Sequence, residues 1–371
     1  MRKACGRIAW PRRPVFKTVP HPAPTASARR LELIREPGFG RVFTDHMVTI
    51  RYSEAMGWHD AVVGRRGPIM LDPAAAVLHY AQEIFEGLKA YRTDDGRVLL
   101  FQPQANARRF QRSAARLAMP SLPEALFVEA LEQLVRADAA WIPQGDGSLY
   151  LRPFMIATEA FLGVKPSSEY LFAIIASPVG SYFKTAAEPL SVWVSEDLSR
   201  AGPGGAGAAK CGGNYAASLL AQAEAARRGC EQVVFLDAVE RRWVEELGGM
   251  NVFFVFDDGS LRTPPLGGTI LDGITRSAVI TLARGRGLEV REAGYCLADW
   301  RDDARTGRLR EAFACGTAAV VAAIGQVKTA EGDFAIGDGG EGALTAQLRA
   351  QLVDIQRGRS ADSHGWTHLV A

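Results

Sequence analysis

The sequence predicts a mixed α+β protein built from two domains. The chain has 371 residues, which exceeds the usual length of a single domain. Stretches with the period-two pattern of strands and stretches with the 3.6-residue period of helices are mixed in both halves. Between the halves, residues 183–189 lack a strong pattern and end in proline, as a linker would. We therefore expect a basic disordered extension at 1–36, a smaller α/β domain at 37–182, the linker, and a larger C-terminal domain at 190–371.

The N-terminal domain is expected to combine strands with amphipathic helices. Runs rich in β-branched and aromatic residues predict strands over Val42–Tyr52, Val98–Phe101, Ser148–Ala157 and Tyr170–Ser177. Apolar residues at helical spacing predict helices over Ala105–Ala118 and Glu124–Ala140. The order of these strands and helices does not fit a single sheet built from consecutive βαβ units.

The C-terminal domain is expected to contain more strand and a glycine-rich loop. Strands are predicted over Leu190–Ser195, Gln232–Asp237, Val252–Phe256 and Glu289–Ala293. Helices are predicted over Tyr215–Arg228, 274–286 and 341–357, with the glycine-rich loop at 202–213 and a turn at Ala314–Ala318.

The net charge of +2 conceals two differently charged parts. Eight of the 43 basic residues lie in the first thirty positions, which contain no acid. The remaining 35 basic residues stand against all 41 acidic ones, so the rest of the chain carries a formal charge of −6. A nucleic-acid partner is therefore not expected, because phosphate binding needs clustered positive charge on the folded part. The acid-poor start also resembles a transit peptide, although four prolines between Pro11 and Pro22 oppose the required helix.

Several other classes are disfavoured by composition. No apolar run approaches the roughly 18 residues that span a bilayer, so we expect no membrane partner and a cytoplasmic location. The five cysteines form no C-x-x-C pair, and the six histidines leave 80–363 without one, so neither a disulfide framework nor a metal site is expected. Only seven lysines occur, which leaves few candidates for chemistry that needs a primary amine.

The glycine-rich loop admits two interpretations. Residues 202–207 match G-x-G-x-x-G between a predicted strand and helix, which favours dinucleotide binding by a nicotinamide-dependent dehydrogenase. However, six residues separate Gly207 from the helix, and Asp237 lies 30 residues beyond it where about 20 are typical. The same loop contains Lys210 in an apolar context. A desolvated lysine forms Schiff bases with carbonyls such as that of pyridoxal phosphate, although a surface lysine in a mobile loop fits the loop alone equally well.

A pyridoxal phosphate site needs further parts, and the sequence contains a candidate for each. Glu246 comes just before a predicted strand and could pair with the pyridine nitrogen. Gly273-Ile274-Thr275 opens a predicted helix, whose free backbone N–H groups favour a phosphate. The turn Cys315-Gly-Thr317-Ala318 could present amides to a second anion.

Taken together, these motifs resemble those of the branched-chain aminotransferases, which are fold-type IV (class IV) pyridoxal phosphate enzymes. The resemblance is carried by Lys210-x-Gly-Gly-Asn-Tyr215, Glu246-x-Gly-Gly-Met-Asn251, Pro264-Pro265-Leu, Gly273-Ile-Thr275-Arg, Gly316-Thr317-Ala318, Gly38-Phe39-Gly40, Thr44-Asp45-His46-Met47, Leu78-His79-Tyr80, Phe85-Glu86-Gly87-Leu-Lys89 and Tyr150-Leu-Arg152-Pro153. It covers about residues 36–371. The actinobacterial members, which also have Glu-Glu-x-Gly-Gly-Met-Asn and many arginines, are the most similar in these features.

The resemblance implies a small N-terminal α/β domain, a larger β-rich C-terminal domain, and pyridoxal 5′-phosphate between them. It assigns Lys210 as the catalytic Schiff-base lysine and proton shuttle. Glu246 would pair with the pyridine nitrogen and Tyr215 with the phenolic oxygen of the ring. The remaining cofactor contacts, to the phosphate, would come from Arg109, Ile274, Thr275 and Thr317.

The resemblance also implies the substrates and their contacts. The reaction would be a reversible ping-pong transamination between leucine, isoleucine or valine and 2-oxoglutarate, catalysed by a homodimer. The α-carboxylate would rest on Thr317 and Ala318 with help from the Tyr80 hydroxyl, and Arg152 would take the second carboxylate of glutamate. Phe39, Phe85, Tyr150 and Tyr182 would line the apolar side-chain pocket, whereas Lys89 is interpreted as structural.

Three alternatives stay open on sequence grounds. D-amino acid aminotransferases and aminodeoxychorismate lyases share the lysine and glutamate but are typically shorter and lack the Tyr150-x-Arg152 pair. A nicotinamide-dependent dehydrogenase and a non-catalytic protein of the same fold are the other two. The chain also departs from some relatives by lacking C-x-x-C after the Gly316-Thr-Ala turn, so thiol control is not expected, and by having Gly249 where others have threonine.

Overall fold

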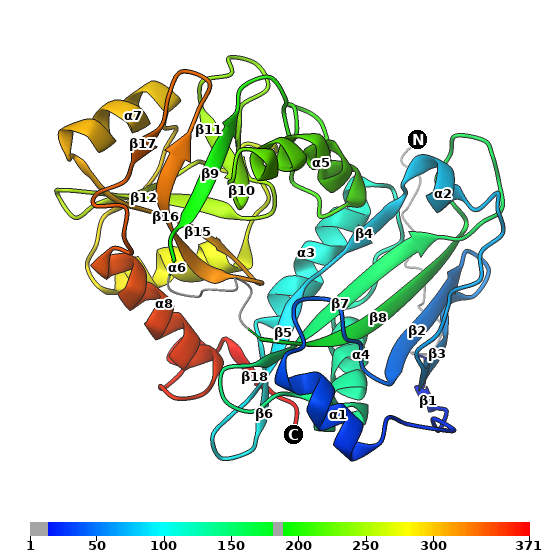
Figure 1. Ribbon diagram of the computed structural model, residues 1–371. Coiled ribbons are helices and arrows are strands. Elements are labelled where there is room, and N and C mark those ends of the chain that lie inside the picture. Colours follow the sequence, from blue (N-terminus) through cyan, green and yellow to red (C-terminus); the bar gives the residue numbers. More distant parts are fainter. Residues whose placement is uncertain (1–13, 181–187) are drawn as a thin grey trace, which may run out of the picture.

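The computed structural model describes residues 14–180 and 188–371, which form two β-sheets with their helices side by side (Figure 1). The predicted mixed α+β class is confirmed. Each sheet contains nine strands, and in both sheets the strands pair largely in an antiparallel manner. The segment that joins the two parts, together with Tyr182 and most of the predicted linker, lies outside the described residues.

The first sheet is built from the N-terminal half of the chain and one strand from the C-terminal end. Its strands are β1 (Lys17–Thr18), β2 (His46–Ser53), β3 (Gly57–Arg65), β4 (Glu83–Phe85), β5 (Leu88–Arg92), β6 (Val98–Phe101), β7 (Ser148–Ala157), β8 (Glu169–Val179) and β18 (Thr367–Leu369). They pair in the order β1-β3-β2-β8-β7-β5-β6-β18, with β4 beside β7.

Helices α1 (Ser27–Arg35), α2 (Ala76–Tyr80), α3 (Pro103–Arg116) and α4 (Glu124–Ala137) accompany this sheet. The apolar stripes of α3 and α4 face the sheet, as their helical periodicity predicts. Phe110 of α3 and Phe127 of α4 are fully buried against Phe172 of β8, with ring centroids 5.4 to 5.9 Å apart. These aromatic contacts fix α3, which contributes Arg109 to the pocket described below.

The second sheet comes from the C-terminal half. Its strands are β9 (Leu190–Ser195), β10 (Gln232–Leu236), β11 (Val244–Leu247), β12 (Asn251–Phe256), β13 (Leu261–Thr263), β14 (Val290–Glu292), β15 (Leu309–Gly316), β16 (Val320–Lys328) and β17 (Phe334–Ala335). Its helices are α5 (Gly212–Arg227), α6 (Ile274–Gly285), α7 (Leu297–Thr306) and α8 (Ala343–Gln356). The strand order is β11-β10-β9-β16-β15-β12-β13-β14, with β17 beside β16.

Both faces of the second sheet are buried, and neighbouring phenylalanines of β12 show why. Phe254 points to the face covered by α7, where its ring meets Trp300 at 5.1 Å between centroids. Phe253 points to the opposite face, stacks on Phe313 of β15 at 5.1 Å, and belongs to the cluster under α6 and α8. The sequence of β12 is therefore apolar at successive positions, because its side chains alternate between two buried cores.

Three predicted boundaries require correction. Residues 1–36 were expected to be a disordered extension, but within the described part β1 pairs with β3 and α1 forms a helix (Figure 1). Apolar side chains of α1 pack partly on the first core, which the arginine- and proline-rich composition obscured. The C-terminal domain was expected to run to residue 371, but β18 pairs with β6 and so joins the first sheet. The predicted turn at Ala314–Ala318 also begins later, because β15 continues to Gly316.

Among residues 14–180 and 188–371, no helix combines the length and the apolar character needed to cross a bilayer. The same residues contain no cluster of three histidine, cysteine or acidic side chains that could hold a metal ion.

Candidate active site

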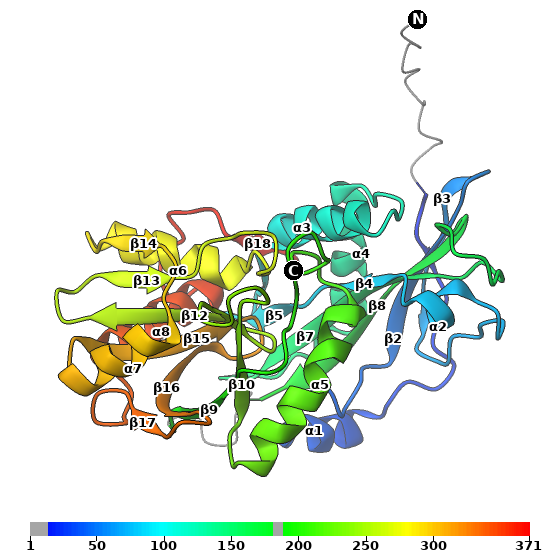
Figure 2. The same ribbon diagram turned by 90° about the horizontal axis from the view of Figure 1, so that it is seen from above.

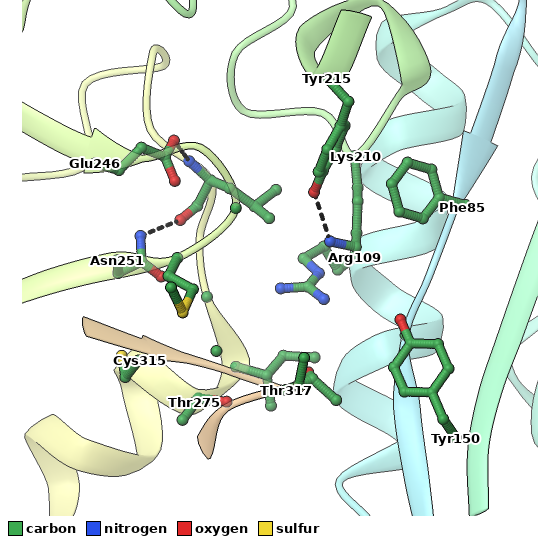
Figure 3. A pocket seen from close by; sticks show the side chains of 18 of the residues that line it. Phe85, Arg109, Tyr150, Lys210, Tyr215, Glu246, Asn251, Thr275, Cys315 and Thr317 are labelled. Atoms are coloured by element: carbon green, nitrogen blue, oxygen red, sulfur yellow. Dashed lines mark hydrogen bonds between the residues drawn. The ribbon is translucent and has the colours of Figure 1, made fainter. Parts of the chain in front are cut away.

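Figure 2 shows the two sheets and their helices side by side from above. A pocket of about 180 Å³ lies between these two halves of the molecule (Figure 3). Strand β4, helix α3 and strand β7 form one wall, and the start of α5, the ends of β11 and β12, the start of α6 and the turn after β15 form the other. Twelve predicted site residues line it: Phe39, Phe85, Arg109, Tyr150, Arg152, Lys210, Tyr215, Glu246, Ile274, Thr275, Thr317 and Ala318. The fold thus gathers residues from motifs spread over most of the sequence.

Lys210 is held in place by its backbone and by an aromatic pair. Its N–H donates to Ser113 Oγ at 2.9 Å, and its carbonyl accepts from the N–H of Phe85 at 2.9 Å. Its Nζ donates to the Tyr215 hydroxyl at 2.8 Å and lies 4.9 Å from the centre of the Phe85 ring (Figure 3). The amine is therefore fixed at the pocket wall with a phenol as its partner.

The glycine-rich loop before Lys210 packs closely against another backbone segment. A Cβ atom at Gly207 would collide with the carbonyl oxygen of Thr269, so only glycine permits this approach of two backbone segments. The Asn214 amide at the start of α5 donates to the carbonyls of Ala206 and Ala209, both at 2.8 Å. These contacts give Gly207 and the loop a packing role that needs no nucleotide.

Glu246 is buried at the end of β11 with only one of its oxygens engaged. Oε1 accepts from the N–H of Leu271 at 2.9 Å and lies 3.0 Å from Nη1 of Arg200. No described residue donates to Oε2. Burial raises the pKa of Glu246 to about 7, although Arg200 and the Leu271 amide lower it. The free oxygen is available to a protonated ring nitrogen.

Arg109 lies beside a buried acid that sequence reasoning did not assign to the site. Its Nε and Nη2 donate to Glu86 Oε1 and Oε2 at 2.7 and 2.8 Å, and both side chains are almost fully buried. Burial alone would raise the pKa of Glu86, but the Arg109 guanidinium holds it below its usual value. Nη1 of Arg109 donates to the carbonyl of Asp272 at 3.1 Å, which directs the guanidinium toward the start of α6.

The start of α6 is built to receive an anion. No side chain caps this helix end, so the first backbone N–H groups, including those of Ile274 and Thr275, are left free of side-chain acceptors. A Cβ atom at Gly273 would collide with the Asn251 side chain, which itself donates to the carbonyl of Leu271 at 3.0 Å. Helix N-termini favour negative charge, and Arg109 adds a cation at the same place.

The turn after β15 is fixed from the first sheet. Lys89 of β5 is buried and its Nζ donates to the carbonyl of Ala318 at 2.8 Å. Burial, with a smaller contribution from Arg357, lowers the pKa of Lys89 to about 8. Lys89 thus connects the two halves of the molecule, in agreement with its structural interpretation.

An aromatic wall surrounds one more cation. Nη2 of Arg152 donates to the Tyr150 hydroxyl at 3.0 Å, and the guanidinium lies 4.7 Å from the centre of the Phe85 ring. The Arg152 Nε is buried and has no hydrogen-bond partner among the described residues. Phe39 packs edge-on against Tyr150 with centroids 5.0 Å apart. The wall is therefore aromatic and contains one guanidinium, whose Nε has no hydrogen-bond partner among the described residues.

Two predicted substrate contacts are not found in the pocket. Tyr80 does not line it; the side chain is 38% exposed, and its hydroxyl donates to the carbonyl of Leu162. Helix α2 ends at Tyr80, and the phenol of this residue is exposed on the surface. Tyr182 lies outside the described residues.

This donor set fits pyridoxal 5′-phosphate. The uncapped helix start with Arg109 can hold the phosphate, Glu246 Oε2 can accept from the ring nitrogen, and Tyr215 lies beside the Lys210 amine. A lysine amine, a buried carboxylate and an anion seat in one pocket define the site of a pyridoxal phosphate-dependent enzyme.

Comparison with known proteins identifies the family. The family described as "Amino-transferase class IV" matches residues 83–327. The chain is 56% identical to the "Branched-chain-amino-acid aminotransferase" of Mycolicibacterium smegmatis, over 92% of this chain and 95% of that protein. It is 54% identical to the "Probable branched-chain-amino-acid aminotransferase" of Streptomyces coelicolor, over 96% of this chain and 99% of that protein. The chain therefore belongs to the class IV aminotransferases, as the motifs predict, and its cofactor is pyridoxal phosphate.

The fold agrees with this assignment. The branched-chain amino acid aminotransferase of Thermobaculum terrenum, solved in its PLP form, superposes with a TM-score of 0.69 at 26% identity, covering 87% of this chain and 98% of that one. The predicted fold-type IV architecture is thus confirmed.

Proposed function

We propose that this protein is a cytoplasmic branched-chain aminotransferase that exchanges amino groups between leucine, isoleucine or valine and 2-oxoglutarate. The observation that carries the proposal is the Arg152 guanidinium, which lines the pocket in an otherwise aromatic wall. Such a wall accepts an aliphatic side chain, and the guanidinium can donate to the second carboxylate of glutamate. The names of the relatives support the same substrate class.

The proposed roles follow from the position of each side chain. Pyridoxal phosphate, when bound, supplies a carbonyl that condenses with amines and a ring that takes up an electron pair. Lys210 Nζ moves the proton at the α-carbon of the substrate, since it is the one amine that the described part of the chain contributes to the pocket lining. Tyr215, already within 2.8 Å of that amine, orients it. Glu246 accepts from the ring nitrogen, and Arg109 with the amides of Ile274 and Thr275 binds the phosphate.

The α-carboxylate is proposed to bind at the turn after β15. Thr317 and Ala318 line the pocket at this turn, and Lys89 fixes the turn through the Ala318 carbonyl. A carboxylate seated there directs the substrate side chain toward the wall formed by Phe39, Phe85 and Tyr150. This arrangement separates the two polar ends of glutamate between the turn and Arg152.

The alternative hypotheses lose support. The matched family and the named relatives are aminotransferases, so a nicotinamide-dependent dehydrogenase and a non-catalytic protein are not favoured. D-amino acid aminotransferases and aminodeoxychorismate lyases are disfavoured by the relatives' names and by the presence of both Tyr150 and Arg152 in the pocket.

Arg152→Met is expected to separate the two substrate classes. Loss of charge-assisted hydrogen bonds to the second carboxylate should raise KM for glutamate about 10- to 100-fold, while kcat/KM for leucine stays within about threefold. The measurement is steady-state transamination with leucine, isoleucine, valine, phenylalanine, glutamate and D-alanine as donors.

Arg51→Met is the matched control, because Arg51 is an exposed arginine of the same sheet. Equal losses for leucine and glutamate would show that Arg152 only supports the pocket. Absence of leucine turnover by the wild-type protein would remove the proposed function.

We also propose that the protein is a homodimer. Apolar side chains are exposed on α2 and on the adjacent segment 159–166, where Leu78, Leu162 and Val164 are 58%, 63% and 89% exposed. Contiguous exposed apolar surface of this kind is typical of a protein interface. Tyr80 belongs to the same surface through its bond to the Leu162 carbonyl. Its predicted contact with a substrate would therefore be made in the pocket of the second copy.

The dimer is expected to dissociate when this surface becomes charged. The mass is measured by light scattering after size-exclusion chromatography. The wild type should have twice the mass of one chain, and the double variant Leu162→Asp with Val164→Asp should have the mass of a single chain. Val239→Asp is the control, since Val239 is 73% exposed on a different part of the surface. A wild-type protein with the mass of one chain would contradict the proposal.

A further inference from the structure

Arg200 lies buried behind the pocket and joins three segments of the site. Its side chain is 4% exposed. Nη1 donates to the carbonyl of Thr269 at 2.8 Å and lies 3.0 Å from Glu246 Oε1, while Nη2 donates to the carbonyl of Gly207 at 3.2 Å. The guanidinium thus touches the glycine-rich loop before Lys210, the segment before α6 and the carboxylate of Glu246 at once.

The surroundings of Glu246 make this contact important. Burial favours the neutral form of the carboxyl, and the neighbouring carboxylate of Glu245 on the same strand acts in the same direction. Opposing them are the Leu271 amide and two cations, Arg200 and Lys210. Of the two cations, only Arg200 makes an ion-pair contact with Glu246, and it is itself buried. Buried ion pairs of this kind are screened little by solvent.

We propose that Arg200 is a positioning residue that keeps Glu246 ionised and leaves its Oε2 oxygen free for the pyridine nitrogen of the cofactor. The proposal rests on the role of Glu246 given under the proposed function. Arg200 does not line the pocket and acts through Glu246.

The geometry explains both parts of this role. Arg200 and the Leu271 amide engage the same oxygen, Oε1, so the carboxylate cannot turn without losing both partners. The other oxygen is left on the pocket side (Figure 3). The charge of Arg200 opposes protonation, which matters because burial places the pKa of Glu246 at about 7, where a small change alters the ionised fraction. A neutral Glu246 could no longer hold the ring nitrogen in its protonated form.

The test compares Arg200→Met with Arg116→Met. Arg116 is a matched control because it also donates to carbonyls of the glycine-rich loop, those of Gly204 and Gly205, but is exposed and does not contact Glu246. In the cofactor-free protein, the Glu246 carboxyl is titrated by ¹³C NMR, with its resonance assigned by its loss in Glu246→Gln. Arg200→Met should raise the titration midpoint by about 1 to 3 pH units, and Arg116→Met should leave it unchanged.

The second measurement is the dissociation constant of pyridoxal phosphate as a function of pH. For a rise of one or two units in the pKa of Glu246, Arg200→Met should bind roughly 3- to 25-fold more weakly than wild type at pH 7.5 and within about twofold at pH 9. A merely structural role would weaken binding by the same factor at every pH. In the Glu246→Gln background, the Arg200 substitution should no longer change this pH dependence.

The outcomes separate this proposal from the proposed function. An unchanged Glu246 midpoint, or a binding ratio independent of pH, would overturn the role of Arg200 while the aminotransferase function stands. Failure of the wild type to bind pyridoxal phosphate would instead overturn the site assignment itself. Should Arg200→Met not fold, Arg200→Gln serves, because a glutamine removes the charge but can still donate a hydrogen bond to a backbone carbonyl. Its midpoint should lie above that of wild type, and an unchanged value would again overturn the proposal.

Discussion

Replacing Lys210 by alanine is expected to lower kcat at least about 10⁴-fold, because the substitution removes both the amine that binds the cofactor carbonyl and the group that moves the α-proton. Among residues 14–180 and 188–371 no other lysine lines the pocket, so Lys17, Lys89, Lys165 and Lys328 are not placed to substitute for it. The Phe85 and Ser113 contacts use the backbone of residue 210 and persist in alanine. The variant should therefore fold normally. The measurements are single-turnover transamination and the visible absorbance of the cofactor-loaded protein.

Lys328→Ala is the control for this experiment. Lys328 lies on β16 and donates to the carbonyl of Arg228, away from the pocket. Its removal should leave kcat and the absorbance band as in the wild type. Retention of the band or of more than about one hundredth of the activity in Lys210→Ala would contradict the assignment of the catalytic lysine.

Arg109→Met is expected to destabilise the cofactor-free protein by about 3 to 5 kcal/mol, because it leaves Glu86 as a buried carboxylate without its cation. Glu86 has no exposed side-chain surface, so water cannot replace the guanidinium. The remaining donors are the Asn106 amide, at 2.8 Å, and the N–H of Gly87, at 3.2 Å. Urea unfolding at pH 7 measures the loss, and phosphate-dependent binding of the cofactor should fall with it.

The pH dependence gives a second check with a defined sign. In the wild type, Arg109 holds the pKa of Glu86 below its unfolded value, so the pair stabilises the protein above that value. This contribution is lost as the pH falls through the folded pKa. In Arg109→Met, the largest influence that opposes burial is lost, so burial should raise the pKa of Glu86. The instability should therefore be largest at neutral pH and diminish as the carboxyl is protonated on acidification.

Arg108→Met controls for helix effects. Arg108 occupies the neighbouring position of α3 but is exposed and faces Glu124 at 3.5 Å. Its loss should change the free energy of unfolding by less than about 1 kcal/mol. Equal destabilisation by the two substitutions would show that the buried pair contributes nothing specific.

The elements that the sequence predicted well are those with an unambiguous pattern. The strands Val98–Phe101, Ser148–Ala157 and Leu190–Ser195 have the predicted bounds, because each is an apolar or alternating run between turn residues. Strands β15 and β16 were not predicted. Their central Ala-Phe-Ala-Cys-Gly and Val-Ala-Ala-Ile-Gly runs are rich in alanine, whose pattern does not separate a buried strand from a buried helix.

The residues of the site were largely predictable, whereas their partners were not. Lys210, Glu246 and Arg109 belong to linear motifs with a consistent order, and the structure brings all three to one pocket. Glu86 was read only as part of a motif and Arg200 lies outside the motifs, so neither was assigned to the site. Arg200 and Glu246 are far apart in the sequence and meet only because β9, β10 and β11 are neighbours in the second sheet.

The sequence by itself determined the chemistry: one lysine among seven with a matching glutamate, tyrosine and helix start, and a chain whose basic excess lies in its first thirty residues. Those conclusions depend on residue type and order, which are local properties. Only the tertiary structure decided which oxygen of Glu246 is free, which cation faces it, that Tyr80 lies on the outer surface, and that β18 returns to the first sheet. Hydrogen bonding and desolvation depend on the atoms that surround a group, and the fold brings those atoms from distant parts of the chain.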